Sequence, residues 1–155
     1  MARWGYRAME SDTGLDILQY IGSNCMKEGK ELSLRDTLKA LQDAGMLDSP
    51  DCKNTEPFDE ACVALTELCV HWAETAELCS YHNSRHALTE LAGLKRFHME
   101  ADALGFLRRR MEEIQDDIDC CEREYAAFWF EAADYYDWTC YIDRITSKLA
   151  ALPEA

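Results

Sequence analysis

Glycine and proline are scarce in this chain, which has seven glycines and three prolines among its 155 residues. No glycine follows Gly105, and no proline lies between Pro57 and Pro153. Both residues are common in turns and interrupt helices, so long segments without them favour helical structure. The sequence therefore predicts an all-α fold, a bundle of five or six helices.

Basic side chains are also few. Lys and Arg number 16 against 30 Asp and Glu, which makes the formal net charge −14. Affinity for nucleic acid depends on cationic groups that neutralise phosphates, so direct nucleic-acid binding is not expected. A basic protein is the partner that this charge favours.

Long apolar runs are absent. The opening segment, MARWGYRAMESD, lacks the roughly 7–15 apolar residues of a signal peptide. No segment approaches the about 20 apolar residues of a membrane-spanning helix. We therefore expect a cytoplasmic protein that does not bind a membrane.

Cysteines are numerous, at eight, but no two of them form a CxxC pair. This spacing argues against a zinc ribbon or a thioredoxin-type motif. Cys62, Cys69 and Cys79 follow the same steps of three and four as Leu65 and Trp72. Because a reduced thiol behaves as a small apolar group, the pattern predicts that these cysteines lie in the core.

Catalytic signatures are missing as well. The chain has no GxSxG elbow, no GxxxxGK[ST] phosphate loop and no GxGxxG dinucleotide motif. A cysteine–histidine nucleophile pair has no supporting pattern. The sequence thus predicts no enzymatic activity and no required cofactor.

We expect one helical domain over residues 1–155. It divides into N-terminal helices (1–47), a turn-rich linker (48–56) and the main helices (57–155). Linker residues 48–56 read DSPDCKNTE, a composition typical of turns.

Capping residues indicate where the first two helices begin. Asp12 or Thr13 can cap a helix that continues to about Gly29. Ser33, with an acidic residue three positions later, can cap a second helix that Gly45 closes.

The third and fourth helices are expected on either side of a turn. Asn54 or Thr55 caps the third helix, which should continue to about Ser80. The fourth begins after Asn83 or Ser84. Its apolar side would hold Leu88, Leu91 and Leu94.

Apolar residues recur at steps of three and four from Leu104 to Leu149, a heptad-patterned C-terminal region. One straight helix over residues 102–150 would be about 70 Å long. A domain of this size has a diameter of roughly 40 Å. We expect a break near 99–105 or 120–124; the alternative is a projecting helix that pairs with a second chain as a homodimer.

One cluster has the residue types of a metal site. His82, His86 and Glu90 recur every four residues, so a continuous helix would place them in one row. Cys79 lies one turn before them, and His71 on the preceding helix could complete the site. Imidazole, thiolate and carboxylate groups bind zinc or iron. The alternative is a helix junction in which the same residues cap helices and pair on a solvated face.

Eight of the sixteen aromatic side chains lie between Tyr125 and Tyr141, interleaved with acidic residues. In a continuous helix Glu131, Asp134, Trp138 and Tyr141 share one face. Carboxylates and aromatic rings together attract cations, and Tyr and Trp are common in binding hot spots. The face is either a recognition surface or the wet edge of a core helix.

Arg108, Arg109 and Arg110 form the longest basic run. Consecutive helical residues spread over about 200°, so they cannot form one cationic patch. Glu112 and Glu113 follow at helical spacing. We expect a surface ion-pair network.

The N-terminal segment RWGYRAMESDTGLDIL resembles the opening of the bacterial family called domain of unknown function 4259. The residues that carry the match are Trp4, Gly5, Met9, Ser11, Asp12, Asp16 and Leu18. Met9 stands where the family usually has an aromatic residue. The resemblance implies a bacterial or phage setting and no particular activity.

Together these features favour a small acidic protein that binds a basic protein partner, as an inhibitor, immunity factor or phage counter-defence protein does. The residues expected to contact the partner are Asp116, Asp117, Glu131, Asp134, Trp138 and Tyr141. The alternative function is a metal-binding protein or metal-dependent enzyme that uses the cluster at residues 79–90.

Overall fold

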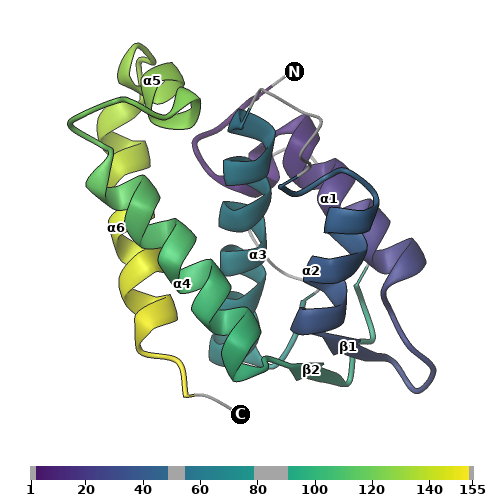
Figure 1. Cartoon of the computed structure of the whole chain (residues 1–155). Helices are drawn as coiled ribbons and strands as arrows, with labels where there is room; N and C mark the ends of the chain where they lie inside the picture. Colours follow the sequence, from purple (N-terminus) through teal and green to yellow (C-terminus); the bar gives the residue numbers. More distant parts are fainter. Residues whose placement is uncertain (1–2, 49–54, 79–90, 154–155) are drawn as a thin grey trace.

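The computed structural model describes residues 3–48, 55–78 and 91–153, which are predominantly helical, as predicted (Figure 1). The α-helices are α1 (Asp12–Asn24), α2 (Leu34–Asp43), α3 (Glu56–Thr75), α4 (Ala101–Asp116), α5 (Glu124–Phe130) and α6 (Tyr135–Ala150). A 3₁₀ helix, η1 (Ala8–Glu10), precedes α1. The two short strands are β1 (Glu31–Ser33) and β2 (Arg96–His98).

Helix α3 forms the centre of the bundle. It packs against η1 and α1 on one side and against α4, α5 and α6 on the other (Figure 1). Every residue from Phe58 to Val70 is buried, as is typical of a helix surrounded by protein. Cys62 and Cys69 are among them, which confirms their predicted place in the core.

Helix α1 begins one residue earlier than expected, because Ser11 caps it instead of Asp12 or Thr13. The Ser11 hydroxyl accepts a hydrogen bond from the Gly14 backbone N–H at 3.1 Å. Gly14 is required for packing, since a Cβ atom there would lie 2.0 Å from the Ala8 carbonyl oxygen. The start of α1 and the 3₁₀ helix before it are therefore tightly packed together.

The two strands were not expected from the sequence. They pair in parallel, with Leu32 opposite Phe97 and both side chains buried. The predicted first helix ends at Asn24 rather than Gly29, because the chain then turns back into β1. An isolated β-bridge between Lys27 and Glu31 closes that turn.

The boundaries of α2 and α3 follow the predicted caps at three of four ends. Ser33 accepts a hydrogen bond from the Asp36 N–H and begins α2, and α3 starts just after Thr55. Gly45 follows α2 with φ of 76°. However, α3 ends at Thr75 instead of Ser80, because the next residue, Ala76, is left-handed with φ of 55°.

The predicted fourth helix, after Asn83 or Ser84, falls mostly on residues 79–90, outside the described part of the chain. Leu91 and Leu94 are described: both are buried, as expected, but they lie in a turn rather than in a helix. Residues 49–54 of the predicted linker also lie outside the described residues.

The C-terminal heptad region is not one helix. Residues 117–123 separate α4 from α5, which confirms a break at 120–124, and residues 131–134 make a second break that was not predicted. Cys121 has φ of 54° in the first break, a left-handed conformation that no α-helix continues through. The segments fold back, so that α6 packs along α4 and α3 (Figure 1).

Candidate functional site

Large exposed apolar side chains gather at one end of the bundle. In the described residues they are Phe128, Phe130 and Tyr136, with exposed fractions of 44%, 59% and 77%. All three belong to α5 or to the first turn of α6. Exposed apolar groups gathered in one region mark interaction sites more often than single ones do.

The register of α5 explains this exposure. The helix buries Tyr125, Ala126 and Trp129 on one side, and Phe128 and Phe130 flank that buried face. The Trp129 ring stacks on Trp138 at 5.6 Å between centroids, with an interplanar angle of 7°. A helix of this length has too narrow a contact with the bundle to cover all its aromatic groups.

Acidic residues are numerous in the part of the sequence that carries these aromatic side chains. Residues 111–140 contain ten Asp and Glu and a single basic residue, Arg123, a formal charge of −9. Asp116, Glu131 and Asp137 are exposed, and Asp134 is half-buried. We call this surface the acidic aromatic end. It comprises Asp116, Phe128, Phe130, Glu131, Asp134, Tyr136 and Asp137.

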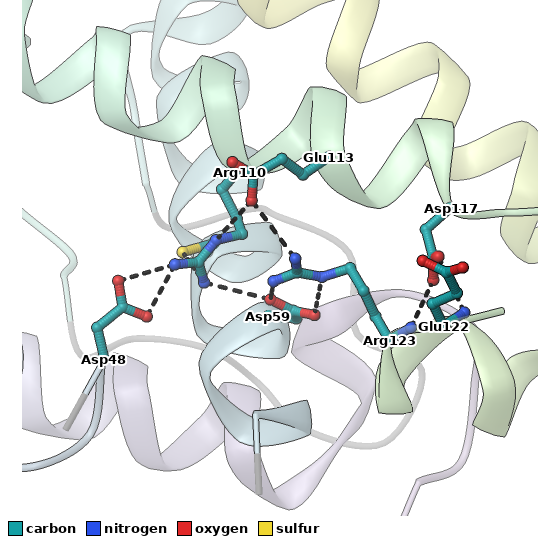
Figure 2. A network of polar contacts seen from close by, with 8 residues as sticks. Asp48, Asp59, Arg110, Glu113, Asp117, Glu122 and Arg123 are labelled. Atoms are coloured by element: carbon teal, nitrogen blue, oxygen red, sulfur yellow. Dashed lines mark hydrogen bonds and ion pairs between the residues drawn. The ribbon is translucent and has the colours of Figure 1, made fainter. Parts of the chain in front are cut away.

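A buried ion-pair network holds this end in place (Figure 2). The carboxylate of Asp59 in α3 is fully buried and accepts hydrogen bonds from Arg110 in α4 and Arg123 before α5. Arg110 also pairs with Asp48 at 2.8 Å, and Glu113 lies 3.4 Å from Arg123. The network thus joins α3, α4 and the start of α5.

Arg110 corrects the prediction of a surface ion-pair network in the basic run. Only 14% of its side chain is exposed, because α4 packs against α3 at this point. Arg108 contacts backbone instead of carboxylates: it donates hydrogen bonds to the carbonyl oxygens of Leu149 and Leu152 near the end of α6. Two of the three arginines in the basic run therefore join helices within the fold.

Asp117 is a structural residue rather than a partner-binding one. Its buried carboxylate accepts the backbone N–H groups of Glu122 and Arg123, each at 2.9 Å (Figure 2). These bonds fix the turn between α4 and α5. Its neighbour Asp116 is exposed and stays in the candidate surface.

The prediction that Trp138 and Tyr141 face a partner is wrong. Both are buried, with exposed fractions of 0% and 1%. Trp138 packs between aromatic rings of α5, and the Tyr141 hydroxyl bonds to Glu67 in α3. The expected common face fails because Glu131 and Asp134 lie in the break before α6 and not on the same helix.

The metal-site hypothesis falls largely outside the described residues, since Cys79, His82, His86 and Glu90 all lie there. His71 is described and lines a cleft beside α6; partial burial lowers the pKa of its imidazole. Among residues 3–48, 55–78 and 91–153, no group of three His, Cys, Asp or Glu side chains is arranged to hold a metal.

Sequence reasoning missed which aromatic side chains are exposed. Phe128, Phe130 and Tyr136 belong to the recognised aromatic cluster, but one continuous helix was assumed there. A break at residues 131–134 changes which residues share a face. The run AADYY contains no glycine or proline, so only the acidic residue Asp134 hinted at a new helix start.

Comparisons with known proteins leave the chain without an assigned relative: no protein-family model, curated protein or solved structure matches it. The N-terminal resemblance to the domain of unknown function 4259 family therefore stays a prediction. In the part of the chain that the structure describes, none of the helices has the length and apolar character needed to cross a membrane.

Proposed function

We propose that the chain is a small acidic protein that works in the cytoplasm by binding a basic surface of another protein through its acidic aromatic end. An inhibitor, an immunity factor or a phage counter-defence protein would work in this way. The supporting observation is that the large exposed apolar side chains of the described residues belong to the most acidic region of the sequence.

The two kinds of side chain have different roles in such an interface. Exposed Phe128, Phe130 and Tyr136 provide apolar contact area, and aromatic residues are enriched at protein interfaces. The surrounding carboxylates attract a basic partner, speed association and disfavour acidic partners. Two acidic aromatic ends would repel one another, so a basic partner fits this surface better than a second copy of the chain does.

Charge reversal tests the proposal. The variant Asp116→Lys with Glu131→Lys changes two exposed residues at the ends of α4 and α5, where a cation suits the helix dipole. The control variant Asp16→Lys with Glu28→Lys makes the same charge change at exposed positions elsewhere. Each variant has a formal charge of −10, because two −1 groups become +1.

The full chain and both variants are immobilised, and proteins captured from a bacterial lysate are identified and their affinities measured. We expect a basic protein that the control binds as well as the original chain does. The first variant should bind it at least about tenfold more weakly. High salt should weaken binding too. Equal capture by both variants would contradict the proposal.

A further inference from the structure

A cleft of about 230 Å³ lies between α3, α6 and the segment before η1, away from the acidic aromatic end. Arg7 borders it from the N-terminal segment, Glu67 and His71 from α3, and Arg144 and Lys148 from α6. Glu74 of α3 lines it too, so the lining has three permanent cations and two carboxyl groups. This is unusual in a chain with nearly twice as many acidic as basic residues.

In the described part of the chain, two of the cations have no carboxylate within ion-pair distance, although the charge of Arg7 acts on Glu67. Lys148 pairs with Glu74 at 2.6 Å, but Arg7 and Arg144 form no ion pair among the described residues. The Arg7 guanidinium lies 5.6 Å from the ring centre of Tyr6, and that of Arg144 lies 5.9 Å from the ring centre of Tyr141. Guanidinium groups bind carboxylates in a bidentate manner, so an anion suits this position.

A buried polar atom at the cleft also lacks a partner. Glu67 is only 8% exposed, and its Oε1 accepts a hydrogen bond from the Tyr141 hydroxyl at 3.2 Å. The Tyr141 hydroxyl in turn accepts the Ala8 N–H at 3.2 Å. The other oxygen, Glu67 Oε2, is buried with no hydrogen-bond partner in the described residues. Such atoms are rare and call for an explanation, and a bound ligand supplies one.

Protonation decides what Glu67 offers a ligand. Burial raises the pKa of this carboxyl group to about 7, although the positive charge of Arg7 opposes the rise. Near neutral pH a large fraction is therefore protonated, and a protonated Oε2 donates a hydrogen bond instead of repelling an anion. Burial lowers the pKa of the His71 imidazole, which favours its neutral form.

The net charge of the cleft and its apolar lining indicate which class of ligand it could bind. Glu74 neutralises Lys148, so Arg7 and Arg144 leave a charge of +2 with Glu67 protonated and +1 with Glu67 ionised. A monoanion leaves the cleft at +1 or neutral, whereas a dianion leaves it at −1 whenever Glu67 is ionised. The remaining lining includes Val70 and Ile145, which give an apolar wall. The volume is below the roughly 300–1,000 Å³ of sites for drug-sized ligands.

We propose that this cleft binds a small organic monocarboxylate, with its carboxylate between Arg7 and Arg144 and its apolar part on Val70 and Ile145. Binding of an anion favours protonated Glu67, so affinity should decrease as the pH rises through neutrality. The charged and titratable groups that face Glu67 from the surrounding elements are Arg7, Glu10, Glu60, His71, Glu74, Tyr141, Arg144 and Lys148.

The test is a titration of the isotope-labelled full-length chain with sodium butyrate, followed by backbone amide chemical shifts at constant ionic strength. We expect saturable shifts in residues 67–74 and 141–148, and weaker binding at about pH 8 than at about pH 6. Arg144→Gln should weaken binding about tenfold or more. Arg109→Gln, which changes an exposed arginine on α4, should have no effect.

Two further arms separate the site from general charge effects. Glu67→Gln should keep butyrate binding but reduce its pH dependence, because glutamine does not titrate. Butylammonium, which has a similar apolar part and the opposite charge, should not bind. Absence of saturable shifts, equal binding of butylammonium or of inorganic phosphate, or unchanged binding in Arg144→Gln would each overturn the proposal.

Discussion

Arg123 donates two hydrogen bonds to the buried carboxylate of Asp59, from Nε at 2.9 Å and from Nη2 at 2.8 Å. The two residues are far apart in the sequence, and their pairing ties the start of α5 to the central helix α3. Arg110 bonds to the same carboxylate at 3.2 Å. The position of the acidic aromatic end thus depends on one buried acidic side chain.

Replacement of Asp59 by alanine should therefore be costly. The change leaves Arg110 and Arg123 without their shared partner, and we expect a loss of about 2–4 kcal/mol in the free energy of unfolding. Asp102→Ala is the matched control, since Asp102 forms an exposed pair with Arg35 and should cost less than about 1 kcal/mol. Urea denaturation followed by circular dichroism measures both. Similar losses in the two variants would contradict the role of Asp59.

Trp138 and Tyr136 should respond in opposite ways, although they are two residues apart on α6. Trp138→Ala removes a fully buried indole and should lower the free energy of unfolding by about 3–5 kcal/mol. Tyr136→Ala removes an exposed ring and should change it by less than about 0.5 kcal/mol. The same denaturation experiment distinguishes them. An unchanged free energy of unfolding in Trp138→Ala would contradict the burial of Trp138.

Glu67 should make stability depend on pH. Its pKa is raised by burial to about 7 in the folded chain, against about 4.3 in an unfolded one. Between these values the folded state binds more protons than the unfolded state, so the contribution of Glu67 to stability decreases as the pH rises from about 4 to about 7.

The variant Glu67→Gln lacks this titration. Its free energy of unfolding, relative to that of the original chain, should rise between about pH 5 and about pH 8. Urea denaturation at several pH values measures the difference. The titration of other groups contributes equally to both chains and therefore cancels. A difference that stays constant over this range would show that Glu67 has an ordinary pKa.

Replacement of Ala76 by glycine should stabilise the protein. Ala76 ends α3 in a left-handed conformation with φ of 55°, which glycine adopts without strain. Ala76→Gly should raise the free energy of unfolding by about 0.5–1 kcal/mol. The same substitution at Ala73, an exposed residue inside α3, should lower it by about 1 kcal/mol. Thermal denaturation of the two variants checks the opposite signs; a loss in both would contradict the left-handed assignment.

Helix starts could be predicted from the sequence where a local rule applies. Ser33 caps α2 through its own side chain, and Thr55 precedes α3 with a proline in the first turn. The strands could not be predicted in this way. Leu32 and Phe97 pair across a long sequence separation, and three-residue strands carry no detectable alternation.

The sequence predicts the acidic and aromatic character of the candidate surface and some of the residues that form it. The acidic and aromatic composition of the last third is visible in the sequence, and Asp116 and Glu131 are exposed, as a binding surface requires. Trp138 and Tyr141 were misplaced because residues 131–134 break the helix. A heptad pattern indicates which residues are apolar, but it does not show where the chain turns.

The sequence by itself determined the helical class, the core positions of Cys62 and Cys69 and the strong negative charge, because these follow from composition and from helical spacing. Only the tertiary structure decided which polar groups meet. Asp59 and Arg123, or Glu67 and Tyr141, come together through the packing of α3 against α5 and α6. Contacts between distant residues depend on how helices cross. The spacing of residues along one helix carries no information about the crossing.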